Sequence, residues 1–203
     1  MSLTTYAELQ AAIIARSQKN NVSELVPDYI TIAEAILNRA LDTPYQLSRV
    51  TTNATAGNAY VSLPDDFLVM KNVQINNSGT YLLKYMTPDA MDKWYFSTST
   101  SVPEAYTILG DELQLGPIPT STYQIELAYT AKIPALSDTN TSNWLLALAP
   151  DLYLYTALSE LFNETYDDAR ADKYKAWSIA IVKDLNALAK KADQGTSMTM
   201  VRG

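Results

Sequence analysis

Two pairs of adjacent carboxylates, Asp65-Asp66 and Asp167-Asp168, are the residues whose types and spacing come nearest to catalytic chemistry. Two acidic side chains that converge on one ligand can cleave glycosides or supply oxygen ligands for Ca²⁺ or Mg²⁺. Adjacent residues on a strand or helix point apart, however, so neither pair converges automatically. We therefore expect Asp65-Asp66 to serve a turn, and Asp167-Asp168 to lie at the positive end of a helix.

The chain of 203 residues contains no cysteine and no histidine. Their absence excludes disulfides, Cys/His zinc sites, thiol nucleophiles and every acid–base scheme that uses imidazole. The sequence also lacks a calcium loop, a phosphate loop and a Gly-x-Ser-x-Gly elbow. We predict that the protein is not an enzyme and has no catalytic, metal or cofactor-binding residues.

The formal net charge of −7 limits the possible partners. A general nucleic-acid binder needs a basic surface to neutralise phosphates, whereas an acidic surface lets DNA pass without binding it. No apolar run approaches the roughly 18 residues that span a bilayer, so we predict no membrane contact. Residues 1–8 carry no basic residue before their apolar positions, and we expect no secretory leader there.

Helical periodicity is confined to the two ends of the chain. Thr5-x-x-Glu8 is a capping box and begins a helix, while Pro27-Asp28 opens a second helix that Pro44 prevents from continuing. In the C-terminal part, apolar residues recur every three or four positions and Gly195 ends the last helix. The predicted helices span about 5–17, 27–41, 143–149, 151–162 and 167–195, and residues 193–203 are predicted to form a flexible tail.

The middle of the chain has the period of β-strands. Gly110-Asp111 lies between two alternating segments and predicts a hairpin, and Thr87-Pro88 predicts the start of a short helix. The predicted strand pairs are 68–75 with 81–85 and 105–109 with 112–115, and a long strand follows over 123–132. The predicted fold is therefore α+β: residues 1–46 and 140–203 form one discontinuous helical bundle, and residues 47–139 form an inserted antiparallel β-rich domain.

The helix predicted over 151–162 is apolar almost all round. Such a helix must be covered on several sides, either by its own domain or by neighbouring subunits. Large aromatic residues with polar tips are typical anchors of such packing. The interface residues that we predict here are Trp144, Tyr153 and Tyr155, with Met198, Met200, Val201 and Arg202 in a tail that is either disordered or folds onto a partner.

Aromatic residues of the insert leave a second function open. Sugar-binding proteins stack aromatic rings on their ligands, although aromatic residues on strands more often pack across the sheet. The residues concerned are Tyr81, Tyr85, Trp94, Tyr95 and Tyr106. A carbohydrate-binding module that uses these aromatic residues is therefore one hypothesis.

Several short segments, taken together and in order, give the chain a family resemblance. They are Thr5–Gln10, Val26–Ile30 with Ala33-Glu34 and Leu37–Arg39, Tyr60–Phe67, Thr107–Gly116, Tyr129–Asp138, Asn143-Trp144, Pro150–Leu158 and Asp167–Arg170. With these segments the chain resembles the head-to-tail adaptor (connector) proteins of short-tailed and some other tailed bacteriophages.

The resemblance implies a structural virion protein of the neck or tail region, assembled in the host cytoplasm. Its implied partners are the portal protein, further copies of itself in a ring that is usually dodecameric, and a tail nozzle or fibre protein. The ring extends the channel through which phage DNA passes without specific binding. The resemblance also implies that the C-terminal segment, here about 192–203, docks on the portal.

Overall fold

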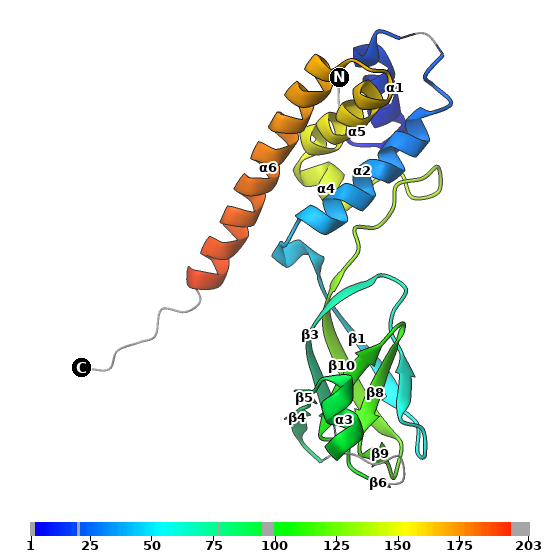
Figure 1. Ribbon diagram of the computed structural model, residues 1–203, viewed down its shortest axis with the longest axis vertical. Coiled ribbons are helices and arrows are strands. Elements are labelled where there is room, and N and C mark those ends of the chain that lie inside the picture. The colour runs from blue at the N-terminus through cyan, green and yellow to red at the C-terminus, as the bar shows by residue number, and fades with distance from the viewer. Residues whose placement is uncertain (1–2, 20, 77, 95–99, 196–203) are drawn as a thin grey trace, which may run out of the picture. The chain divides into compact units, whose positions relative to one another are not determined.

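The computed structural model describes residues 3–19, 21–76, 78–94 and 100–195 (Figure 1). Within these residues the fold is α+β, as predicted, with six α-helices and mainly antiparallel sheets. The chain divides into two compact units. We call Met1–Gln46 with Ile133–Gly203 the helical unit, and Leu47–Lys132 the β unit.

The first two helices begin and end close to where local sequence signals place them. Helix α1 (Tyr6–Ser17) starts with the predicted capping box: the Thr5 hydroxyl accepts a hydrogen bond from the Glu8 N–H at 3.3 Å, and the Glu8 carboxylate accepts one from the Thr5 N–H at 3.1 Å. Helix α2 (Val26–Ala40) carries Pro27 in its first turn. The 3₁₀ helix η1 (Pro44–Gln46) follows it.

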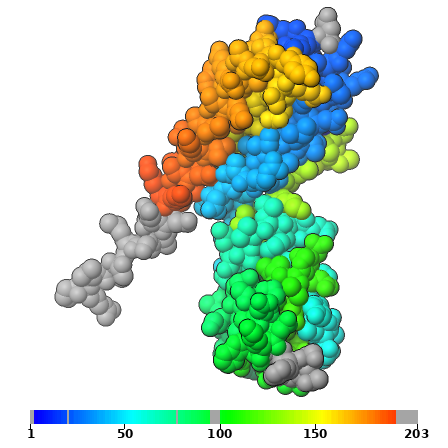
Figure 2. All heavy atoms as spheres, in the orientation of Figure 1, coloured from blue at the N-terminus to red at the C-terminus, as the bar shows by residue number. Residues whose placement is uncertain are grey.

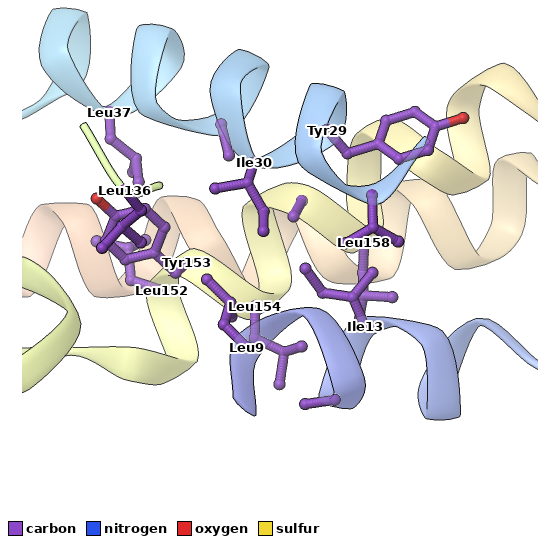
Figure 3. Close-up of a cluster of buried hydrophobic side chains, with 14 of the residues drawn as sticks. Leu9, Ile13, Tyr29, Ile30, Leu37, Leu136, Leu152, Tyr153, Leu154 and Leu158 are labelled. Carbon is purple, nitrogen blue, oxygen red and sulfur yellow. The ribbon is translucent and has the colours of Figure 1, made fainter. Parts of the chain in front are cut away.

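Helix α5 (Pro150–Glu164) lies at the centre of the helical unit. It packs against α1, α2, α4 (Trp144–Leu148) and α6 (Asp168–Gly195). Figure 3 shows how Leu154 and Leu158 of α5 meet side chains of α1 and α2 such as Leu9 and Ile30. The two ends of the chain thus form one packed body, seen in blue and in yellow to orange in Figure 2. The helices that bury α5 therefore belong to its own unit.

In its described residues the β unit contains two four-stranded sheets, whose orders are β1-β10-β3-β4 and β2-β8-β7-β5, and a small pair, β6-β9. Apolar side chains from both larger sheets form its core, including Val73, Leu113 and Ile125, which are fully buried. The elements are β1 (Leu47–Ala54), β2 (Tyr60–Ser62), β3 (Phe67–Asn76), β4 (Thr80–Leu82), β5 (Lys84–Tyr85), α3 (Pro88–Trp94), β6 (Thr100–Ser101), β7 (Ala105–Leu109), β8 (Glu112–Gly116), β9 (Ile118–Pro119) and β10 (Tyr123–Ala131).

The predicted β7–β8 hairpin is confirmed, with Gly110 at a φ of +59° in its turn. The strand predicted over 81–85 is only half right. Residues of β4 pair with β3, but β5 leaves that sheet and pairs in parallel with β7. Between them the side chain of Leu83 is buried in the core of the β unit. One continuous apolar segment is therefore shared between two sheets, which a period-2 pattern does not reveal.

Two boundaries differ from the predicted ones. Residues 133–139, assigned to the insert by sequence, cluster with the helical unit because their backbone binds α2: the Ile133 N–H donates to Asn38 Oδ1 and the Leu136 N–H to Glu34 Oε1, both at 2.8 Å. At the other end, α6 ends at Gly195, as predicted for the last helix, so residues 193–195 are helical and do not belong to the predicted tail. The rest of the predicted tail lies outside the described residues.

Because α5 is enclosed, shortening one of its buried side chains should destabilise the helical unit strongly. We expect Leu158→Ala, at a fully buried position, to lower the free energy of unfolding by about 2–5 kcal/mol through lost burial and a residual cavity. Urea denaturation followed by far-UV circular dichroism measures this loss. Ile179→Ala, on the exposed side of α6, is the matched control and should change stability by about 0.5 kcal/mol or less. Equal losses for the two variants would contradict the central place of α5.

Candidate functional site: aromatic and polar residues of the helical unit

The predicted interface residue Tyr153 lies inside the helical unit. Its side chain is fully buried, and Figure 3 shows it beside Leu136 and Leu37. The Tyr153 hydroxyl accepts a hydrogen bond from Asn143 Nδ2 at 2.7 Å and donates one to Glu34 Oε1 at 3.2 Å. Its polar tip is thus already used within the chain. An anchoring role between subunits does not suit this residue.

Glu34, Asn143 and Tyr153 form a buried polar cluster, here called the Glu34 cluster. Besides bonding Tyr153, Asn143 caps α4 by accepting from the Leu146 N–H at 2.8 Å, and it donates to the Pro134 carbonyl at 2.7 Å. Glu34 binds the Leu136 N–H as described above. The cluster therefore ties α2 to the start of α4, to α5 and to the chain that returns from the β unit.

Burial raises the pKa of the Glu34 carboxyl, although the hydrogen bonds from Leu136 and Tyr153 oppose this shift. Burial also raises the pKa of Tyr153, so its hydroxyl stays protonated and able to donate. Glu34 belongs to the segments that carry the family resemblance, but no role is predicted for it from the sequence. A signal was present, because Glu34 completes the spacing i, i+3, i+4, i+7 with Ile30, Ala33 and Leu37 on the buried face of α2.

Trp144 and Tyr155, the other described residues of the predicted interface, are half-buried at two different places. Trp144 stacks on Tyr45 of η1, with ring centroids 5.5 Å apart and planes 14° from parallel. Tyr155 contacts Trp177 of α6 at 5.1 Å and Tyr174 at 5.8 Å. Trp177 is 42% exposed. Trp144 and Tyr155 therefore stack on different aromatic partners and do not form one aromatic cluster. Met198, Met200, Val201 and Arg202 lie outside the described residues.

One carboxylate of each pair, Asp66 and Asp167, makes a structural contact. The Asp66 carboxylate accepts a hydrogen bond from the Tyr129 hydroxyl at 2.8 Å, and Lys132 Nζ donates to the Asp65 carbonyl at 2.8 Å. Asp167 precedes α6, where it accepts from the Arg170 N–H and pairs with its guanidinium at 3.3 Å. Among the described residues, no group of three or more acidic side chains is placed to hold a metal ion.

The aromatic residues considered for sugar binding are divided by burial. Tyr81, Tyr85 and Trp94 are exposed, whereas Tyr106 is buried and meets Tyr85 edge to face at 5.6 Å. Tyr95 lies outside the described residues. Part of this aromatic set is therefore core packing of the β unit, and part of it is open to a partner.

The polar contacts described above hold elements of the fold together. The family model described as SU10 adaptor protein matches residues 4–202. The chain belongs to this family, which places it among the head-to-tail adaptors of tailed phages. No curated protein matches the chain. None of the helices in the described part of the chain is both long enough and apolar enough to cross a membrane.

The buried Glu34 carboxyl should give the helical unit a stability that depends on pH. Its pKa is raised above the ordinary 4.5 only in the folded state, so its contribution is fully present below about pH 4.5 and is lost as the pH rises through the folded pKa. Glu34→Gln resembles the protonated form at every pH. We expect the unfolding free energy of the wild type minus that of Glu34→Gln to fall as the pH rises, and then to level off.

Urea denaturation at a series of pH values, followed by tryptophan fluorescence, measures this difference. Glu24→Gln removes one exposed carboxylate and controls for the change in net charge. A difference between wild type and Glu34→Gln that stays constant with pH, or that grows as the pH rises, would show that the carboxyl is not desolvated as described.

Proposed function

We propose that the chain is a non-enzymatic structural protein that forms a ring beneath the portal of a phage head. In this role the ring has twelve copies, as the resemblance implies, extends the DNA channel and provides a platform for tail nozzle or fibre proteins. The single observation that carries the proposal is the family match over residues 4–202. The protein then belongs to the virion neck, after assembly in the host cytoplasm.

The surface of the helical unit supports an assembly role. A ring subunit needs two different contact surfaces, because head-to-tail contacts join unlike patches. Taken alone, this unit exposes large apolar side chains from several segments. They are Ile14, Leu25, Ile32, Tyr45, Leu148, Tyr166, Trp177, Ile179 and Leu188. Three of them, Tyr45, Leu148 and Leu188, line one groove. A contiguous apolar surface is typical of a site that a partner covers.

Residues of two kinds are proposed to contact the portal or a neighbouring subunit. Trp144 and Tyr155 are half-buried, so each keeps part of its ring open to a partner. Met198, Met200, Val201 and Arg202 would contact the portal through the C-terminal segment. We leave out Tyr153, because its side chain is fully buried.

The net charge of −7 supports a channel that DNA crosses without specific binding. Every Lys or Arg that neutralises a phosphate releases counterions and adds affinity, which would slow the movement of DNA. A predominantly acidic subunit limits this braking.

A second candidate, a carbohydrate-binding module, is favoured by one observation: Tyr81, Tyr85 and Trp94 of the β unit are exposed, and Trp94 is exposed by 73%. Rings of this kind stack equally well on sugars or on a protein partner. Direct binding to a glycan that is lost in Trp94→Ala would favour the sugar-binding function. Binding to the portal with no glycan affinity would favour the adaptor.

We expect the isolated chain to sediment as a monomer, and to co-sediment with the cognate portal ring when the two are mixed. Met198→Asp/Met200→Asp should abolish co-sedimentation, because two charges would have to be buried in an apolar contact. Ser197→Asp/Thr199→Asp is the matched control, since it adds the same charge to the same segment and keeps both methionines. Sedimentation velocity is measured for the isolated chain and for the portal mixed with the wild type, with Met198→Asp/Met200→Asp and with Ser197→Asp/Thr199→Asp.

Stable dodecamers of the isolated chain would contradict ring formation that depends on the portal. Failure of the wild type to co-sediment with the portal would contradict portal docking itself. Equal loss in both double variants would show that charge, rather than the methionine side chains, decides the contact.

A further inference from the structure

An apolar groove of about 310 Å³ lies on the helical unit. Its walls come from three segments that are far apart in sequence: η1, the end of α4, and the C-terminal half of α6. The apolar residues that line it are Pro44, Tyr45, Leu148, Leu185, Leu188 and Ala189. The volume corresponds to about ten water molecules, so the groove fits a few side chains and not a whole helix.

The groove is preformed by contacts on both sides. The Asn186 side chain joins α6 to the end of α2, donating to the Ala40 carbonyl and accepting from the Asp42 N–H, both at 2.9 Å. On the other wall, the stack of Tyr45 on Trp144 fixes the tyrosine ring. A rigid apolar groove loses little conformational entropy when it is filled.

The groove nevertheless leaves large apolar side chains exposed. Tyr45 is 63% exposed, Leu188 61% and Leu148 43%. Covering such a surface is favourable by roughly 25 cal/mol for each Å² of apolar area removed from water. An occupant with apolar side chains on a short, narrow segment would match its size and chemistry.

We propose that this groove binds the chain's own C-terminal residues 198–201. Seven residues separate Leu188 from Gly195, which is about 10 Å along a helix. Eight residues follow Gly195, and an extended chain of that length reaches about 26 Å. The segment is therefore long enough to turn back at Gly195, a residue type common at such reversals, and to reach the groove.

The composition of the segment fits the groove. Met198, Met200 and Val201 are its apolar residues, and Arg202 is the only charged side chain after Gly195. Methionine is unbranched and flexible, so it fills irregular apolar spaces well. A short tether also gives the chain's own segment an effective concentration in the millimolar range, which favours it over a segment from a second copy in dilute solution.

In the free chain, binding would remove both the groove lining and the apolar side chains of residues 198–201 from water. Release of the segment would expose the groove and the segment together. This inference goes beyond the proposed function, since it concerns the isolated chain and is tested without a portal. Its failure and the failure of portal docking are therefore separate outcomes.

The absence of cysteine from the chain allows a direct test by disulfide formation. Two introduced cysteines form a disulfide only when their Cα atoms come within about 7 Å. The test variant combines Val201→Cys with Leu148→Cys, because Leu148 lines the groove. The control variant combines Val201→Cys with Ala147→Cys, because Ala147 is the exposed neighbour of Leu148 on α4 and does not line the groove. Under mild oxidation of dilute protein, we expect the Leu148 pair to form an intrachain disulfide about ten times faster than the Ala147 pair.

A second pair of variants probes the α6 wall. Leu188→Cys lines the groove, and Ala187→Cys is its exposed neighbour that does not; each is combined with Val201→Cys, and the same preference is expected. Adding Met198→Asp/Met200→Asp should slow the groove pairs to the rate of their controls, whereas Ser197→Asp/Thr199→Asp should not. Far-UV circular dichroism checks that every variant is folded.

Equal rates for groove and control pairs in folded variants would overturn the proposal. Disulfides that join two chains, with little intrachain product in dilute solution, would also overturn it, because the occupant would then be a second copy.

Discussion

The enclosure of α5 is the constraint on which the rest of the helical unit depends. A helix that is apolar almost all round has no stable position at a surface, so α1, α2, α4 and α6 must surround it. Two of these helices precede the β unit in sequence and two follow it. Burying α5 therefore requires helices from both ends of the chain to come together in one compact unit.

The Glu34 cluster makes this enclosure specific. Apolar packing alone tolerates small shifts of helices, whereas buried polar atoms must keep their partners, because an unsatisfied buried group costs about 1–3 kcal/mol. Glu34 from α2, Asn143 before α4 and Tyr153 from α5 satisfy one another and the backbone of residues 134–136. One cluster thus sets the register of three elements and the path of the returning chain.

Local signals in the sequence were sufficient for most helices and for one hairpin. Thr5 and Glu8 form a capping box over four residues, Asn143 and Thr87 precede short helices, and Gly110 permits a left-handed turn. Each of these depends only on neighbours in the chain. They could be read without knowing the fold.

Features that depend on distant residues could not be read in this way. The division of 80–85 between two sheets is decided by β3 and β7, and the attachment of residues 133–139 to the helical unit is decided by side chains of α2. The apolar pattern of α5 predicts that other elements bury this helix. It does not show whether these elements are the chain's own helices or belong to another subunit. For that reason Tyr153 was predicted as an interface residue, although its partners lie within the same unit.

The burial of α5 stabilises the helical unit, and the apolar side chains that this unit leaves exposed are the surface that we propose for assembly. We propose that this protein forms a collar on the portal. Electron microscopy of the cognate portal ring, with and without an excess of this protein, tests the claim most directly. The account predicts additional twelvefold density on the tail-facing end of the portal. An unchanged portal ring, with the protein remaining free, would contradict it.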